Sequence, residues 1–336
     1  MQNYWFRFLG LILILLAVWL LNIGLGSVKI PFEATLSALL GQSVENNSWE
    51  YIIYNYRLPK AMTAILVGGG LALSGLLMQT LFRNPLAGPF VLGISSGASL
   101  GVALLLMGST LLGGLMFSDF SLVAAASLGS FLVLFVVLLV ANRIRDTMAL
   151  LIIGLMFGSI TSAIVSVLAY FSSAEQLQRF IFWSYGSVGN LSWNQNGVLG
   201  GIVLLGLVLS VLSIKSLNAF LLGENYAQSL GVNLKKSRLT LIIATGLLAG
   251  SITAFAGPIA FVGLAVPHLT RQLFNTMEHK ILVPAVFLYG AVLMLFCDTI
   301  AQLPTSAKVL PINAITSIVG APVVIWLLVR KRKMLF

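Results

Sequence analysis

The residues that could support catalysis or bind a metal are few and scattered along the chain. It contains two histidines, His268 and His279, and one cysteine, Cys297. No group of Cys and His has the spacing of metal ligands. Neither the Gly-x-x-x-x-Gly-Lys-Ser/Thr loop of ATP-binding proteins nor the His-Glu-x-x-His pattern of zinc proteases occurs. The sequence therefore indicates no catalytic residue, no metal site, no cofactor and no ATP-hydrolysing site of its own.

Asp298 is the main ionisable side chain within an apolar segment, and it lies near the end of that segment. Proton pumps and secondary transporters generally keep ionisable residues at mid-membrane depth, and no ladder of acidic residues is present here. We interpret Asp298 as part of a helix end or as a partner for a polar side chain, with a proton relay as the alternative. The energy for transport is therefore expected to come from outside this chain.

Residues 83–89 (RNPLAGP) lie between two long apolar stretches and combine two prolines, a glycine and an amide. Irregular backbone at the end of a membrane helix survives only where protein or a water-filled cavity satisfies its polar groups. We therefore interpret this segment as part of a transport pathway rather than as a simple connection.

Membrane helices must position these residues. Of the 336 residues, 59% are hydrophobic and 8% are charged, and the mean hydropathy is +1.02. Since soluble domains carry about 25% charged residues, the composition predicts an all-α polytopic membrane protein. Residues 1–336 are expected to form a single transmembrane domain. The net charge of +10 would suggest nucleic-acid binding in a soluble protein, but these basic residues lie in short loops that orient a protein in the bilayer. No nucleic-acid partner is expected.

Hydropathy predicts about ten membrane-spanning helices. They are residues 6–25, 61–81, 90–107, 120–140, 148–171, 195–214, 239–255, 257–274, 281–300 and 313–329. The eighth is the weakest, because its apolar part covers only residues 258–266. Nine helical residues span about 14 Å, roughly half of the hydrocarbon core. This segment is either a broken crossing or a re-entrant segment.

The distribution of basic residues predicts the orientation. With ten crossings and a cytoplasmic N-terminus, fourteen of the 19 Lys and Arg residues face the cytoplasm and five face outward. Nine crossings would place the basic cluster at residues 330–333 outside. Both termini are therefore expected in the cytoplasm. Residues 6–25 are interpreted as a retained helix and not as a signal peptide.

Two connections are too long to be simple turns. The outer one, residues 26–60, contains an amphipathic piece at 31–40 that suits the membrane surface. The cytoplasmic one, residues 216–238, is predicted to form short helices at 217–222 and 224–230, the second closed by Gly231. Glycines four residues apart favour close helix contacts; they are Gly93, Gly97 and Gly101, Gly154 and Gly158, and Gly246 and Gly250.

Three motifs, taken in order along the chain, resemble those of one known family. Residues 57–60 (RLPK) are similar to its Arg-Leu-Pro-Arg, and Gln79 with residues 83–93 is similar to the loop between its second and third helices. Residues 257–271 (GPIAFVGLAVPHLTR) resemble its Gly-x-Ile-x-Phe-Val-Gly-Leu-x-x-Pro-His-x-x-Arg signature. The resemblance runs from about residue 31 to residue 328 and is to the FecCD family, the membrane subunits of ABC importers for iron-siderophores, haem and cobalamin.

The resemblance implies the architecture of a type II ABC importer permease with ten helices in each subunit. It also implies a second permease subunit, with a homodimer favoured over a pseudo-symmetric heterodimer, and a substrate path along their interface. A cytoplasmic ABC ATPase dimer and a periplasmic or lipid-anchored substrate-binding protein would complete the assembly. The expected location is the cytoplasmic (inner) membrane of a bacterium.

The resemblance further implies contacts with these partners. The coupling loop at residues 216–238 would fit a groove of the ATPase through Glu224, Tyr226, Gln228 and Gly231, with a solvated linker as the alternative. Arg57 and Lys60 would meet acidic residues of the binding protein; alternatively, both anchor the end of the second helix. Gln302 stands where the family has a third arginine, and we expect Lys308 to supply that charge.

Gating residues follow from the same resemblance. Asn84 and Leu86 match one cytoplasmic gate, and Thr147 and Met148 match the other. Met148 is bulkier than the small polar residue expected there. Residues 176–183 look like the short outer helix that caps the path, with an interfacial aromatic belt as the alternative.

Two other classes of protein stay as alternatives at this point. An ion-coupled secondary transporter would need a charge network within the membrane and would transport without an ATPase. A membrane enzyme would need a catalytic cluster, and His268 beside Pro267 fits a structural role better. The sequence does not select among iron-siderophore, haem and cobalamin as substrates, nor does it show whether the two permease subunits are identical.

Overall fold

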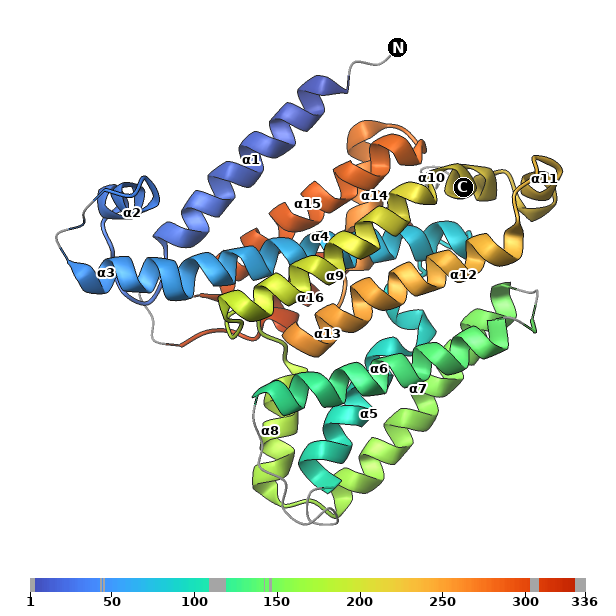
Figure 1. Ribbon diagram of the computed structural model, residues 1–336, viewed down its shortest axis with the longest axis horizontal. Helices are drawn as coiled ribbons and strands as arrows, with labels where there is room; N and C mark the ends of the chain where they lie inside the picture. The colour runs from blue at the N-terminus through green and yellow to red at the C-terminus, as the bar shows by residue number, and fades with distance from the viewer. Residues whose placement is uncertain are drawn as a thin grey trace.

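The described part of the chain is built from helices. The computed structural model describes residues 4–42, 44, 46–108, 119–141, 143–144, 147–302 and 308–329. Within these ranges all regular structure is helical, as the sequence predicted. Figure 1 shows long helices running side by side, with short helices at the two ends of the bundle.

Each predicted crossing corresponds to a helix or a helical run in the described residues. These are α1 (Trp5–Gly24), α4 (Leu58–Leu81), α5 (Ile94–Met107), α6 (Asp119–Ala141), α7 (Thr147–Tyr170), α9 (Trp193–Leu212), α12 with α13 (Leu234–Thr245 and Ser251–Ala256), α14 (Val262–Phe274), α15 (His279–Ala301) and α16 (Ile312–Val329). Seven of the described helical stretches are long and apolar enough to cross a membrane, and α5 and Ile312–Trp326 of α16 are shorter apolar helices.

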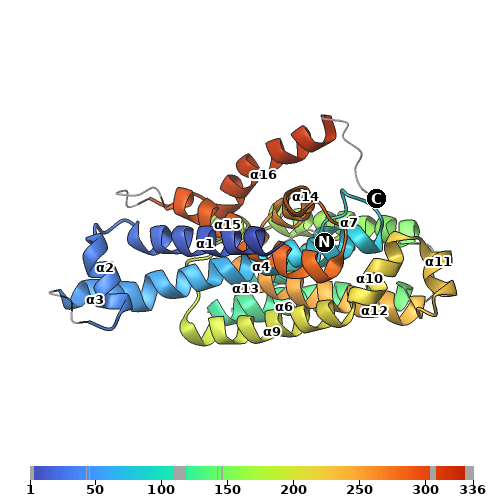
Figure 2. The ribbon, with the colours of Figure 1, turned by 90° about the horizontal axis from the view of Figure 1, so that it is seen from above.

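Short helices mark the two ends of the bundle. One end carries α2 (Phe32–Leu39) and α3 (Asn47–Ile52), and the other carries α10 (Ile214–Leu221) and α11 (Glu224–Ser229). Figure 2, seen from above, separates the same two groups. We refer to these as the α3 end and the α10 end. A further short helix, α8 (Ala174–Ser184), leads from α7 toward α9.

The second predicted crossing extends further toward the α3 end than hydropathy indicated. Helical structure is continuous from Asn47 to Leu81, through α3, a π-helical turn (Ile53–Arg57) and α4. Polar residues in the first part of this run lower its hydropathy, so hydropathy alone did not identify the part before residue 61 as helical. The third predicted crossing is shorter, because a 3-10 turn (Pro89–Leu92) and Gly93, with φ of 73°, precede α5.

The eighth crossing is broken. Its extended part begins after α13, where Gly257 has φ of 76°, and Phe261, with φ of 67°, precedes α14. The Ala260 N–H donates to Asn313 Oδ1 at 3.0 Å, which satisfies one group of this irregular backbone. At the far end of α14, the Phe274 carbonyl accepts from Arg7 at 2.5 Å, near the start of α1. The segment thus runs from the α3 end to the α10 end, as a broken crossing would.

α4 lies at the centre of the bundle and contacts its neighbours through glycines. Within the most apolar stretch of the helical run Asn47–Leu81, 83% of the residues are buried. A Cβ atom added at Gly68 would overlap the Gly290 carbonyl of α15, and one added at Gly75 would overlap the main chain of Gly263 in α14. Helix backbones approach this closely only where side chains are absent. The predicted glycine rows act similarly at Gly97, against α6, and at Gly154, against the Val91 carbonyl.

The Gly75→Ala variant should be destabilised. The added methyl group meets main-chain atoms of Gly263, so α4 and α14 must separate. We expect a loss of about 1–3 kcal/mol, the usual range for overpacking. Thermal unfolding of the purified protein in detergent measures this loss. Gly201→Ala in α9 is the matched control, since nothing lies within 4 Å of its added Cβ. Equal unfolding temperatures for the two variants would contradict the proposed contact.

Candidate functional site

A cavity opens at the α3 end of the bundle. Its volume is about 680 Å³. The walls come from the loop after α1, the start of α4, the loop between α8 and α9, the end of α15 and the segment before α16. Polar lining residues include Tyr56, Arg57, Lys60, Asp298 and Gln302. Two of the three predicted binding-protein contacts, Arg57 and Lys60, therefore line one cavity.

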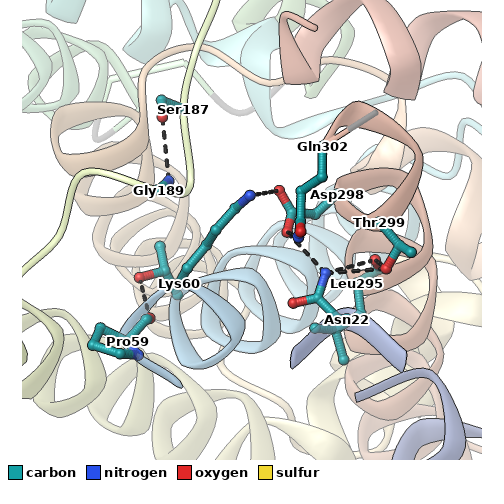
Figure 3. Close-up of polar contacts among 10 residues, drawn as sticks. Asn22, Pro59, Lys60, Ser187, Gly189, Leu295, Asp298, Thr299 and Gln302 are labelled. Atoms are coloured by element: carbon teal, nitrogen blue, oxygen red, sulfur yellow. Dashed lines mark hydrogen bonds and ion pairs between the residues drawn. The ribbon is translucent and has the colours of Figure 1, made fainter. Parts of the chain in front are cut away.

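Within this cavity Lys60 pairs with Asp298. The Lys60 Nζ atom lies 3.1 Å from Asp298 Oδ1, and the two side chains are 18% and 3% exposed. Asp298 Oδ2 accepts from Asn22 Nδ2 and from Gln302 Nε2, both at 2.9 Å. Figure 3 shows these side chains converging from α1, α4 and the end of α15. Breaking such a buried pair leaves an uncompensated charge, so the cluster joins three helices firmly.

These contacts clarify the role of Asp298. Its carboxylate has three polar partners, which agrees with the interpretation of Asp298 as a local partner for polar side chains. Among the described residues it is the only buried acidic side chain. Gln302, which is predicted to stand where the family has a third arginine, contributes a neutral hydrogen bond to the same carboxylate.

Arg57 lies mostly below the surface. Its guanidinium donates to the carbonyls of Ile23 at 2.6 Å, Gly24 at 3.0 Å and Val28 at 2.5 Å, and the residue is 8% exposed. The last carbonyls of a helix lack partners within the helix, so Arg57 closes the end of α1. This arrangement supports the anchoring interpretation, and a contact between Arg57 and another protein stays a prediction.

Lys308 lies at the rim of the cavity. It is exposed and precedes Val309 and Leu310, both of which line the cavity wall. The Leu310 N–H donates to the Ala301 carbonyl at 2.8 Å, which holds this segment against the end of α15. The exposed Lys308 thus directly precedes the wall of the cavity that holds the Lys60–Asp298 pair, and its contact with a binding protein stays a prediction.

The irregular segment after α4, residues 83–89, forms a compact turn that we call the gate loop. Arg83 adopts a left-handed conformation with φ of 47°. The Asn84 side-chain oxygen accepts from the Leu86 N–H at 2.9 Å, a local turn that asparagine favours. Leu86 is 45% exposed, so this loop presents an apolar side chain outward.

The gate loop is held by residues of the third sequence motif. His268 Nε2, on α14, lies 2.8 Å from the Pro85 carbonyl. Arg271 Nη1 donates to Gln79 Oε1 at 2.8 Å, and Gln79 Nε2 donates to the Leu264 carbonyl at 3.1 Å. The two long motifs therefore dock on each other. The sequence motifs contained Gln79 and Arg271, but only the fold shows that they form a buried contact between α4 and α14.

The second predicted gate lies at the start of α7. Met148 is 53% exposed in the first turn of this helix. The side chain of Thr147 lies outside the described residues. The two predicted gates follow α4 and begin α7. The last turn of α4 and the first turn of α7 both lie at the α10 end of the bundle (Figure 1).

The predicted coupling loop is folded as two short helices. α11 ends in a left-handed Gly231 with φ of 81°, and the Val232 N–H donates to the Ala227 carbonyl at 3.1 Å, as predicted for a glycine C-cap. Tyr226 is 54% exposed, and Gln228 and Gly231 are also exposed. Glu224 is half-buried and forms an ion pair with Arg238 of α12. A rigid, exposed surface thus lies at the α10 end.

The helix predicted at residues 176–183 is α8, which begins two residues earlier, at Ala174. Ser173 and Gln176 form a capping box that fixes its start. Phe180 and Trp183 pack against the α5–α6 core, while Phe182 is 61% exposed and lines the cavity at the α3 end. The aromatic residues of α8 therefore serve partly as core.

Comparison with known proteins identifies the family. The model of the FecCD transport family matches residues 13–330. The chain is 39% identical to the vitamin B12 import system permease protein BtuC of Klebsiella pneumoniae over 325 residues, 96% of this chain and 93% of that protein. It is 36% identical to the hemin transport system permease protein HmuU of Yersinia pestis over 327 residues, 97% of this chain and 96% of that protein.

A solved structure agrees in fold. It is described as an inward-facing conformation of a metal-chelate type ABC transporter, is 33% identical, and superposes with a TM-score of 0.83 over 96% of this chain and 98% of that one. Among the described residues no group of three or more His, Cys, Asp or Glu could hold a metal ion. This polytopic helical protein belongs to the FecCD transport family.

Proposed function

We propose that this chain is the permease subunit of an ATP-binding cassette importer that carries a metal chelate from a periplasmic binding protein to the cytoplasm. The observation that carries this proposal is the surface of α11. The helix α11 contacts α10, and α10 is anchored in the bundle by Leu217 and Phe220, which are 0% and 1% exposed. A folded, exposed surface of this kind favours the interpretation of residues 216–238 as a partner-binding loop over the interpretation as a solvated linker.

The named relatives support the choice of substrate class. One is a vitamin B12 permease and one a hemin permease, so both carry large metal chelates. We infer the same class here, with iron-siderophore, haem and cobalamin as candidates. The partners would be an ATPase dimer, a second permease subunit and a substrate-binding protein. In this arrangement the α10 end faces the cytoplasm and the α3 end faces outward, with both termini in the cytoplasm of a bacterial cell.

Two gates would close the path at the cytoplasmic end. Asn84 and Leu86 in the gate loop form one, and Thr147 and Met148 at the start of α7 form the other. Leu86 and Met148 are 45% and 53% exposed, which supports contact with a second subunit across the path. Apolar side chains that meet there would exclude water without a buried charge.

On the outer side, a rim of positive charge would meet acidic residues of the binding protein. Lys308 is exposed, and Lys60 lies deeper, where it pairs with Asp298. Rim charges raise association rates more than they add affinity. Lys308 is therefore expected to guide docking, while Lys60 would contact the partner only through the mouth of the cavity.

An ion-coupled secondary transporter is the second candidate, and the described residues do not favour it. Such a protein needs ionisable side chains along its path. Asp298 is the only buried acid in the described residues, and its carboxylate is already hydrogen-bonded to Asn22 and Gln302 and paired with Lys60.

Reconstitution separates these two functions. Purified permease alone in liposomes should not accumulate substrate against a gradient, with or without an imposed proton or sodium gradient. Addition of the ATPase, ATP and the loaded binding protein should produce uphill uptake, because hydrolysis then supplies the energy. Radiolabelled or coloured chelates measure this uptake. Accumulation by the permease alone would overturn the proposed function.

The Tyr226→Ala variant should bind the ATPase more weakly, by about tenfold or more, since exposed tyrosines are frequent energetic centres of interfaces. Titration of the detergent-solubilised permease with purified ATPase measures the dissociation constant. Tyr51→Ala is the matched control, because Tyr51 is similarly exposed, at 59% against 54%, but lies at the α3 end. Equal affinities for the two variants would contradict docking at α11.

The Lys308→Glu variant should associate with the binding protein about tenfold more slowly at low salt, with little change in dissociation. Stopped-flow mixing at several ionic strengths measures both rates. A compensating acid-to-lysine change on the binding protein should restore the association rate and transport. Lys235→Glu, which reverses an exposed lysine at the α10 end, is the control. Lack of rescue, or the same loss in the control, would count against a specific contact.

A further inference from the structure

The first residue of α15 is a buried histidine that the proposed function does not use. His279 is 0% exposed. Its two ring nitrogens face different helices, α10 on one side and α4 on the other. α10 supports α11 with its predicted coupling surface, and α4 leads into the gate loop, so His279 lies between the two elements that ATP-driven transport must link.

The contact with α10 is made by Asn218. Its Nδ2 donates to Glu278 Oε1 at 2.7 Å, which assigns its Oδ1 as an acceptor. That oxygen accepts from the His279 backbone N–H at 3.0 Å and faces His279 Nδ1 at 2.7 Å. The backbone N–H groups in the first turn of a helix have no partner within the helix. Asn218 therefore holds the start of α15 against α10 through three polar contacts.

The contact with α4 is made by Thr80. His279 Nε2 lies 2.9 Å from Thr80 Oγ1. Because Nδ1 faces an accepting oxygen, it carries the hydrogen of a neutral ring, so Nε2 is an acceptor for the Thr80 hydroxyl, whose one hydrogen is shared with the Leu76 carbonyl at 2.9 Å. Thr80 is itself fully buried and lies four residues before Asn84 of the gate loop. A continuous chain of hydrogen bonds therefore runs from Glu278 through Asn218 and His279 to Thr80.

The surroundings make this chain stiff. Leu217 and Phe220 of α10 are buried beside it, and α4 and α15 are in close contact at Gly68 and Gly290. Separating His279 from Thr80 or from Asn218 would leave a ring nitrogen of this fully buried residue without a partner, which costs more than the net gain of an ordinary hydrogen bond. The start of α15, the end of α4 and α10 should therefore move as one body.

We propose that His279 is a positioning residue that transmits movement of α10 to the gate loop at the end of α4. This proposal rests on the proposed function, since it takes α10 and α11 as the ATPase-contacting elements. His279 has no contact with substrate in this mechanism. It keeps the spacing between coupling helix and gate constant, so that nucleotide-driven displacement of one displaces the other.

The test is the amount of substrate transported per ATP hydrolysed by the complete importer in liposomes. Thr80→Val keeps the shape of the side chain but removes the hydroxyl that meets His279. We expect this ratio to fall about fivefold to tenfold. ATP hydrolysis should stay within about twofold, because Thr80 is fully buried in α4 and is not one of the predicted ATPase contacts. Thr80→Ser, which restores the hydroxyl, should return the ratio to that of the unsubstituted protein.

Thr270→Val is the matched control. Thr270 is equally buried at 0%, and the hydrogen bond of its hydroxyl runs back to Val266 of its own helix at 2.8 Å. The chemical change is identical, but no connection to α10 is interrupted. The ratio of transport to hydrolysis should therefore be unchanged in this variant. Equal losses in Thr80→Val and Thr270→Val would show a general packing effect and overturn the proposal.

A double-mutant cycle tests whether the contacts form one chain. Once Asn218→Ala has interrupted it, Thr80→Val should have little additional effect on the ratio, whereas independent contacts would give additive losses. A second readout is the maleimide labelling rate of Leu86→Cys with and without ATP, in which the native Cys297 is buried. Thr80→Val should abolish the ATP-dependent change in this rate, and Thr80→Ser should keep it.

The possible failures are distinguishable. If the unsubstituted complex shows no ATP-driven uptake, the proposed function fails and the role of His279 fails with it. If the unsubstituted complex transports and Thr80→Val keeps both its ratio and its ATP-dependent labelling, only the role of His279 is overturned. A parallel fall of transport and hydrolysis in Thr80→Val would also overturn it, since a positioning role separates the two.

Discussion

The close contact between α4 and α15 is the constraint on which the rest of the structure depends. Gly68 and Gly290 bring the two backbones together, and Gly75 does the same for α4 and α14. In a bilayer, helices gain little from hydrophobic burial, so such contacts must come from close van der Waals approach of small residues. Because α4 is buried on nearly every side, the positions of α9, α14 and α15 all follow from its own.

Polar contacts close the α4–α15 pair at both ends. At the α3 end Lys60 of α4 pairs with Asp298 of α15, and at the α10 end Thr80 of α4 meets His279 of α15. Each cluster also reaches a third helix, through Asn22 of α1 and through Asn218 of α10. The pair thus joins the predicted binding-protein face to the predicted ATPase face. Because the pair is stiff, a displacement at one of these faces can be transmitted to the other.

The gate loop shows how irregular backbone is held at the end of a membrane helix. Its own asparagine caps the turn, and His268 of α14 contacts the Pro85 carbonyl. α14 is itself the second half of a broken crossing whose extended part is hydrogen-bonded to Asn313 in the first turn of α16. Two irregular segments are therefore satisfied by protein, as the absence of water in a bilayer requires. The same contacts connect the loop to segments far away in the sequence.

Composition and hydropathy alone determined the helical class, the membrane-crossing segments and the positions of the two folded loops. The reason is that the local residue types decide which segments enter the lipid and where a helix ends. The motifs also indicated the family and the importance of residues 83–89 and 257–271. They could not show that Gln79 meets Arg271, that Arg57 is committed to the end of α1, or that His279 joins α10 to α4. The residues of each of these pairs lie between 33 and 199 positions apart in the sequence. Only the tertiary structure decided them, since a polar side chain in a membrane protein takes whichever partner helix contacts bring within reach.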